Sequence, residues 1–173
     1  MNEYRDRLIA LLGSQDPFAV LEATPRRAVD LHGHLGDWRV SQPWAPGKWT
    51  AREVFAHLAD VEQAIGFRVR QIVTSPPGHV IQAFDQDLWA KPYRRLASRA
   101  AVRALVAVRA WNLSYFRTLE AEDLERVGLH PERGEESVET IIRMHAGHDL
   151  NHLAQLDAIA AIPEPVVPDE DDE

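Results

Sequence analysis

The sequence has no cysteine among its 173 residues. A disulfide framework is therefore excluded, and any metal site would have to be built from histidine, carboxylate and water. No apolar run approaches the roughly 18 residues that a membrane-spanning helix needs. The residues after Met1 are charged and lack the apolar segment of a signal peptide. These absences predict a cytoplasmic protein with no membrane partner.

An excess of basic residues is also missing, because 27 acidic residues outnumber 19 lysines and arginines and leave a net charge of −8. Part of that charge lies in the run Asp169–Glu173, so we expect residues 164–173 to form a disordered acidic tail after a single domain of residues 1–163. The rest of the chain is mildly acidic and has no basic stripe interleaved with aromatic residues. We therefore expect no nucleic-acid partner.

Sustained alternation of apolar and polar residues is missing as well, which predicts that the chain has no strands. Apolar residues recur instead with helical periodicity in four segments, residues 2–35, 50–74, 98–119 and 137–162. Gly13, Pro17 and Pro25 are expected to interrupt the first of them. Residues 79–97 form a long connection, of the kind that crosses a bundle or covers a site. The pattern predicts an all-α fold, a four-helix bundle with a long crossover between helices 2 and 3.

Three histidines are concentrated in the fourth helical segment. His145, His148 and His152 are separated by three and four residues, so they share one face of a helix. Neutral imidazole is the commonest side-chain metal ligand, and two histidines four residues apart form a chelating pair. Spacing alone does not decide which of the three would bind a metal.

A third ligand is expected from a facing helix, because catalytic zinc sites commonly use three protein ligands and leave one position for water. His57, in the second helical segment, is the best candidate, since apolar residues flank it. Glu53 and Asp60 lie on the same side of that helix. Either carboxylate could hold the free ring nitrogen of a metal-bound histidine or polarise a bound water.

The other polar side chains are expected to have ordinary structural roles. His79 and His130 lie in predicted loops and are assigned no role. The arginines of the helical segments are expected on solvated faces, although one or two could bind an anionic substrate group. The set comprises Arg68, Arg70, Arg94, Arg95, Arg99, Arg103 and Arg109.

Two stretches of the chain resemble the DinB superfamily. Pro46–Asp60 is similar to its P-x-x-W-[ST] loop and the following H-L-x-D helix, and Met144–Leu153 is similar to the last-helix motif of the YfiT-like branch of metal-dependent hydrolases. The resemblance covers about residues 15–162. It implies an up-down-down-up bundle, a homodimer, and a divalent metal, zinc or nickel, held by His57, His148 and His152.

The resemblance also implies roles for the neighbours of these ligands. It places His145 in support of the ligands, at a position that is often histidine in this branch. Asp149 directly follows the first ligand of the last helix, where many members carry another polar residue or a histidine. We treat Glu53, Asp60, His145 and Asp149 as candidates for supporting the ligands or for catalysis.

The function that these residues and the family resemblance together imply is that of a metalloenzyme acting on a small-molecule substrate. It would catalyse hydrolysis, or the transfer of a low-molecular-weight thiol that serves as a second cofactor. Two alternatives stay open, because fold does not determine function. The protein could be a non-catalytic metal-binding module for sensing or stress response, or a structural bundle whose histidines bond to one another without a metal.

Overall fold

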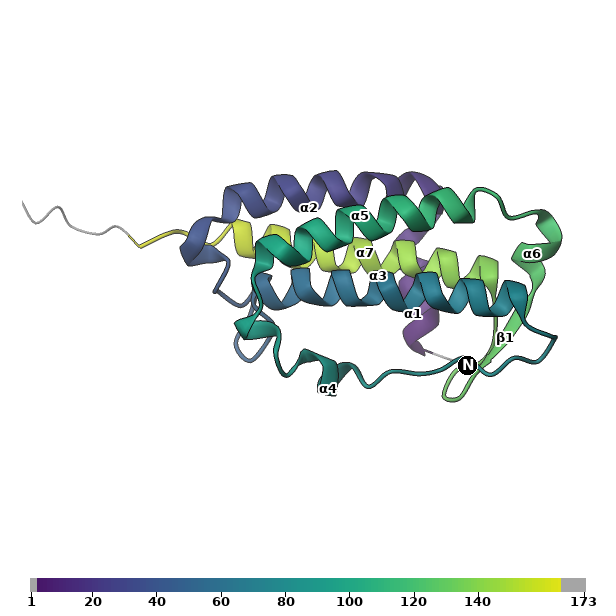
Figure 1. The fold of residues 1–173 in the computed structure, drawn as a ribbon. Helices are drawn as coiled ribbons and strands as arrows, with labels where there is room; N and C mark the ends of the chain where they lie inside the picture. The colour runs from purple at the N-terminus through teal and green to yellow at the C-terminus, as the bar shows by residue number, and fades with distance from the viewer. Residues whose placement is uncertain (1–2, 166–173) are drawn as a thin grey trace, which may run out of the picture.

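Four long helices run side by side in this computed structural model, which describes residues 3–165 (Figure 1). They are α2 (Pro17–Arg39), α3 (Ala51–Thr74), α5 (Ser98–Phe116) and α7 (Val138–Ala160). Helices α2 and α7 run in one direction and α3 and α5 in the other, and each packs against two neighbours. The predicted four-helix bundle and its up-down-down-up order are therefore confirmed.

The long crossover between α3 and α5 is also confirmed. It runs back along one side of the bundle and contains a short helix, α4 (Gln86–Ala90), and a 3-10 turn at Tyr93–Arg95 (Figure 1). The side chain of Asp85 caps α4 by accepting a hydrogen bond from the amide of Leu88 at 3.0 Å. The crossover thus has its own local structure and covers one side of the bundle.

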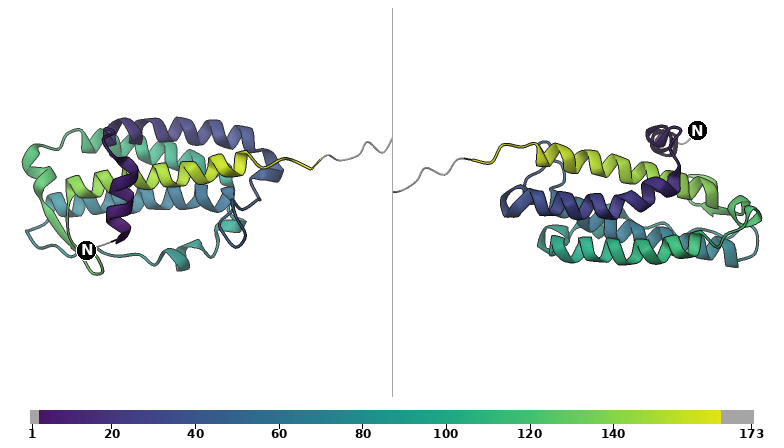
Figure 2. Two further views of the ribbon diagram at one scale, coloured as in Figure 1. Left: turned by 180° about the vertical axis from the view of Figure 1, so that it is seen from behind. Right: turned by 90° about the horizontal axis from the view of Figure 1, so that it is seen from above.

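An additional helix, α1 (Glu3–Leu12), lies across the outer face of α7 (Figure 2). The chain turns at Gly13, where the sequence predicts an interruption of the first helical segment, and its φ of 58° is readily adopted by glycine. At the crossing point α7 presents Gly147, where an added Cβ would lie 1.9 Å from the carbonyl oxygen of Leu8. The absence of a side chain there allows the two backbones to touch.

The prediction that the chain has no strands is wrong. Residues Val127–His130 (β1) and Gly134–Ser137 (β2) form an antiparallel hairpin, preceded by a short helix, α6 (Ala121–Glu125). Strands of four residues are too short to produce a sustained alternation, although Gly128 and His130 do alternate with exposed neighbours along β1. The hairpin leads directly into α7, which Ser137 caps.

The expected break before Pro25 is also wrong, because α2 continues through this residue. Proline has no amide hydrogen, so the carbonyl oxygen of Leu21 receives no helical bond from it. That oxygen accepts a hydrogen bond from Arg109 Nη1 instead, at 2.7 Å. A side-chain donor from α5 therefore replaces the backbone hydrogen bond that this carbonyl oxygen lacks.

The interior of the bundle consists of two apolar clusters with a polar layer between them. One cluster surrounds Phe55 and Leu105, and the other surrounds Leu21 and Phe116. Along α3, α5 and α7, buried polar side chains occupy the positions between the clusters. These side chains are His57, Glu62, Arg109, Asn112, His145, His148, Asp149 and His152.

Two further sequence predictions concern membrane-spanning helices and the acidic end of the chain. Among residues 3–165, no helix is long and apolar enough to cross a membrane. Most of the predicted acidic tail, residues 166–173, lies outside the described part of the chain.

Candidate metal centre

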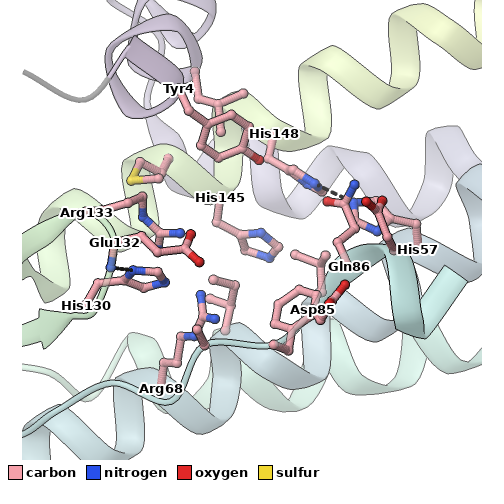
Figure 3. A pocket seen from close by; sticks show the side chains of 17 residues that line it. Tyr4, His57, Arg68, Asp85, Gln86, His130, Glu132, Arg133, His145 and His148 are labelled. Carbon is pink, nitrogen blue, oxygen red and sulfur yellow. Dashed lines mark hydrogen bonds between the residues drawn. The ribbon is translucent and has the colours of Figure 1, made fainter.

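Three histidines from two helices meet in the polar layer. His57 comes from α3, and His148 and His152 come from successive turns of α7. One ring nitrogen of each lies within 4.8 Å of the others, and Nε2 of His57 is 2.9 Å from Nε2 of His148 (Figure 3). The three residues are 1%, 5% and 7% exposed. The structure thus brings together the three residues that the sequence predicts as ligands, which we call the histidine triad.

The loop before α3 positions two of the rings. Trp49 places its indole 4.7 Å from the ring of His57 and 6.3 Å from that of His152, the latter nearly parallel at 17°. Directly after Trp49, Thr50 begins α3 with a capping box to Glu53. The indole is thus adjacent in the chain to the start of α3, and it packs against the rings of both His57 and His152.

Burial keeps the three imidazoles neutral. It lowers the pKa of His57 to about 2 and that of His152 to about 4, and it holds the pKa of His148 well below its usual value. Electrostatic repulsion by neighbouring rings further lowers the pKa values of His57 and His148. Neutral imidazole, with one free lone pair, is the form that binds metals.

The arrangement of the ring nitrogens fits a divalent metal. Gln155 Oε1 lies 2.9 Å from His152 Nδ1, and because this oxygen can only accept, Nδ1 carries the proton and Nε2 has the free lone pair. The Nε2 atoms of His57 and His148 face each other, and at most one proton can lie between them. Three inward-facing imidazoles without a thiolate form a donor set typical of zinc, copper, iron or nickel.

Glu53 and Asp60, the two predicted supporting carboxylates of α3, are bonded elsewhere. Glu53 accepts hydrogen bonds from the backbone amide of Thr50 at 2.8 Å and from Nε of Arg94 at 3.0 Å. Asp60 accepts one from the Tyr93 hydroxyl at 2.7 Å. Within residues 3–165, the Nδ1 atoms of His57 and His148 have no hydrogen-bond partner, so neither carboxylate holds a ring of the triad.

The other two predicted supporting residues, His145 and Asp149, join a buried ion network beside the triad. Arg109 is at its centre and donates to Glu62 at 2.6 Å and to Asp149 at 2.8 Å. His145 Nε2 lies 2.7 Å from Glu62 Oε2 and 3.1 Å from Arg109 Nη2. Burial alone would raise the pKa of Glu62, but the charges of His145 and Arg109 and the hydrogen bonds of His145 and Asn112 lower it to about 2.

This ionisation state determines which nitrogen of His145 carries the proton. An ionised carboxylate can only accept, so the 2.7 Å contact requires a hydrogen on His145 Nε2. The 3.1 Å approach of Arg109 Nη2, which can only donate, is then not a hydrogen bond to that atom. The charge of His145 that lowers the pKa of Glu62 belongs to the protonated ring, in which Nδ1 also carries a hydrogen; only the neutral ring has a free lone pair on Nδ1. Within the described residues that atom has no hydrogen-bond partner.

A cavity of about 670 Å³ lies beside the triad, between α3, α7, the crossover and the hairpin. His57, His145 and His148 form part of its wall, and Figure 3 shows their rings facing it. Phe84 and neighbouring residues of the crossover close another side. Such a volume is typical of a small-molecule site.

Sequence reasoning missed several residues of this region, and two of them had a readable signal. Gln155 lies three residues after His152, a spacing that brings side chains of one helix together. Arg109 was expected on a solvated face, but it is 1% exposed. Its position four residues from both Leu105 and Leu113 places it on the apolar stripe of α5, which indicates burial.

Comparisons with known proteins agree with this fold. The sequence profile of the DinB superfamily matches residues 3–156. A protein of Oceanobacillus iheyensis, named "Putative metal-dependent hydrolase OB0782", is 29% identical over 140 residues, which cover 80% of this chain and 81% of that protein. A protein of Bacillus cereus with the same descriptive name is 25% identical over 140 residues, 80% of each chain.

A solved structure has the same arrangement of helices. YfiT from Bacillus subtilis, described as a probable metal-dependent hydrolase with an unusual four-helix bundle topology, superposes with a TM-score of 0.77. The two chains are 21% identical, and the superposition covers 92% of this chain and 87% of YfiT. On the profile match over nearly its whole length, the chain belongs to the DinB superfamily.

Proposed function

We propose that this protein binds a divalent metal ion, zinc or nickel, through His57, His148 and His152, and that it hydrolyses a small-molecule substrate in the adjoining cavity. The observation that carries the proposal is the set of three neutral, buried imidazoles, two of which form part of the cavity wall. The names of the relatives, metal-dependent hydrolases, are consistent with it.

A divalent metal in this position supplies Lewis acidity and lowers the pKa of water. The chain's own residues determine the rest of the chemistry. Because all three proposed ligands are neutral, they leave the full charge of the cation available to an anionic ligand or substrate oxygen. Trp49 and Gln155 hold two of the rings in place.

His145 is the residue best placed to accept a proton during hydrolysis. It forms part of the cavity wall, its Nδ1 is unpaired among the described residues, and its Nε2–H donates to Glu62. A water that loses a proton to Nδ1 would leave an imidazolium, which the buried carboxylate of Glu62 stabilises. Neither Glu53 nor Asp60 is among the residues lining the cavity, so we do not assign them this role.

Transfer of a low-molecular-weight thiol to an electrophile is the second candidate reaction. The same neutral ligand set favours it, since a cation whose charge is not reduced by carboxylate ligands stabilises a thiolate. Activity screens with ester and amide substrates on one side, and with thiols and electrophiles on the other, distinguish the two. A metal-loaded protein inactive in both would support the sensor or stress-response alternative.

A homodimer and a cytoplasmic location stay predictions from the sequence.

Metal analysis of protein purified without a histidine tag tests the proposal. We expect the wild type to hold about one equivalent of zinc or nickel, and His148→Ala to hold far less while keeping its helical circular dichroism spectrum. The matched control is His34→Ala, because His34 is exposed and its ring bonds to the backbone carbonyl of Asp30 on its own helix.

Thermal unfolding gives a second readout that requires no substrate. A metal that binds only the folded chain adds stability by mass action, so a chelator should lower the Tm of the wild type. It should leave the Tm of His148→Ala unchanged. If the wild type and His148→Ala held equal, sub-stoichiometric amounts of metal, and if the chelator left the Tm of the wild type unchanged, the metal-free structural bundle would be favoured.

A further inference from the structure

The wall of the cavity away from His57 and His148 carries three basic side chains. Figure 3 shows Arg68, His130 and Arg133 gathered on that side. Arg68 comes from α3, His130 ends β1, and Arg133 lies in the turn of the hairpin. The hairpin that the sequence did not predict thus brings two of the three groups to the cavity.

Arg68 is a buried cation without a carboxylate partner. It is 6% exposed, and it forms no salt bridge with any residue of the described chain. Its Nη2 donates to the carbonyl oxygen of Gln82 at 3.3 Å, and its guanidinium carbon lies 5.3 Å from the centre of the Phe84 ring. Since a guanidinium has five N–H donors, most of its hydrogen-bonding capacity and its charge are available to a ligand.

The charges around Arg68 do not neutralise it. Glu136, the buried carboxylate on this side, accepts two hydrogen bonds from Arg133, at 2.5 Å and 2.9 Å, and is 1% exposed. Among the buried groups on this side, Glu136 is therefore paired with Arg133, and Arg68 has no carboxylate bonded to it. The acidic residues at the edge of the cavity, among them Glu132 and Asp85, are exposed, so solvent screens their charges.

His130 supplies an unpaired donor on the same wall. Its Nδ1 accepts a hydrogen bond from the backbone amide of Glu132 at 3.2 Å, so in the neutral ring the proton lies on Nε2. Burial, together with the charge of Arg133, lowers the pKa of His130 and keeps the ring neutral. The residue is 2% exposed, and Nε2 has no hydrogen-bond partner in residues 3–165. A buried N–H without an acceptor costs free energy that a ligand oxygen would recover.

We propose that Arg68 and His130 form a subsite for an organic anion, the carboxylate or phosphoryl group of the substrate. A guanidinium without a salt-bridge partner, with its planar fork of donors, and one imidazole N–H match the oxygens of such a group. The subsite lies in the same cavity as His57 and His148, so an anion held there would direct the rest of the molecule toward these two histidines. That this ligand is a substrate rests on the proposed hydrolase function, whereas the anion binding itself does not.

Titration calorimetry with benzoate, phenylphosphonate and uncharged benzamide tests the subsite. Each probe is titrated into metal-loaded protein and into chelator-treated protein, because an anion could also bind the metal. In both forms we expect one of the anions to bind about tenfold or more tightly than benzamide. The tighter of the two anions identifies the group as carboxylate or phosphoryl.

Variants of Arg68 and His130 test whether these two residues cause the preference for an anion over benzamide. Arg68→Gln and His130→Ala should lose most of the preference for an anion and keep the wild-type metal content, and Arg68→Lys should retain part of it. Arg52→Gln is the matched control, because Arg52 also donates to one backbone carbonyl, that of Leu96, but lies outside the cavity wall.

Two results would overturn the subsite: equal binding of anions and benzamide by the wild type, or a full anion preference in Arg68→Gln. Anion preference that depends on Arg68 in a chain that holds no metal would support the subsite and contradict the metalloenzyme proposal. The two proposals can therefore fail separately.

Discussion

Arg109 links all four helices of the bundle through one guanidinium. From α5 it donates to Leu21 on α2, Glu62 on α3 and Asp149 on α7, and its Nη2 lies 3.1 Å from His145. Attraction to Asp149 and Glu62 outweighs the cost of burial and raises the pKa of Arg109, so the charge is retained. The network stabilises the bundle only while each buried charge keeps its partner.

Replacing Arg109 should therefore lower the stability of the folded chain strongly. Arg109→Met leaves Glu62 and Asp149 buried without a counter-charge, and we expect it to lower the free energy of unfolding by about 3–5 kcal/mol. Urea denaturation followed by circular dichroism measures the change. Arg103→Met is the control, because Arg103 is an exposed arginine on the same helix. Similar unfolding midpoints for the two variants would show that the network contributes little to stability.

The residues of the site divide into those that helical spacing predicts and those that it does not. His148 and His152 are neighbours on one helix, so their proximity follows from the sequence. The approach of His57 depends on how α3 packs against α7, and its proposed role as a metal ligand came from the family resemblance and the apolar flanks of the residue. Glu62 and Arg68 lack such a signal, because their roles depend on partners far away in the chain.

At the scale of elements, the four long helices and the interruption at Gly13 that separates α1 from α2 were predicted, whereas the short helices α4 and α6 and the hairpin were not. The expected start at Thr50 and the expected end near Thr74 agree with α3 to within one residue. The hairpin of β1 and β2 was missed because four-residue strands have almost no periodicity, and its position depends on contacts with other segments. One such contact joins Val80 of the crossover to Leu129 of β1. This tertiary contact stabilises a segment whose local sequence is ambiguous.

The crossing of α1 over α7 gives a prediction at the same scale. Gly147→Ala places a methyl group against the backbone of Leu8, so α1 must move away from α7. We expect a loss of about 1–3 kcal/mol of stability and faster amide hydrogen exchange along α1. Because Tyr4 and Leu8 of α1 line the cavity, its shape should change as well.

Gly33→Ala is the matched control for that experiment. Gly33 is a helical glycine of α2 with no atom within 4 Å of an added Cβ, so its replacement should stabilise the protein by about 0.5–1 kcal/mol. Hydrogen exchange in α1 should stay unchanged. If Gly147→Ala also stabilised the protein and left hydrogen exchange in α1 unchanged, the backbones of α1 and α7 would not be in close contact at this position.

At the scale of the whole molecule, the buried histidines couple the stability of the fold to pH. The pKa of His57 is lowered from 6.5 to about 2 and that of His152 to about 4, chiefly by burial. Below pH 6.5 the unfolded chain therefore binds protons that the folded chain does not, and acid favours unfolding. The stability present above pH 6.5 is lost as the pH falls toward 4. The buried Glu62, with a pKa lowered from 4.5 to about 2, adds its own loss only below about pH 4.5.

The interval from pH 6.5 to 4.5 therefore isolates the histidines in chelator-treated protein. Each buried histidine should contribute up to about 1.4 kcal/mol per pH unit to the slope of unfolding free energy against pH. Urea denaturation across this interval should give a slope that His152→Gln reduces by about that amount. His34→Gln should leave the slope unchanged, since the His34 ring is already exposed in the folded chain. An unaltered slope in His152→Gln would mean that water reaches the triad and protonates it in the folded state.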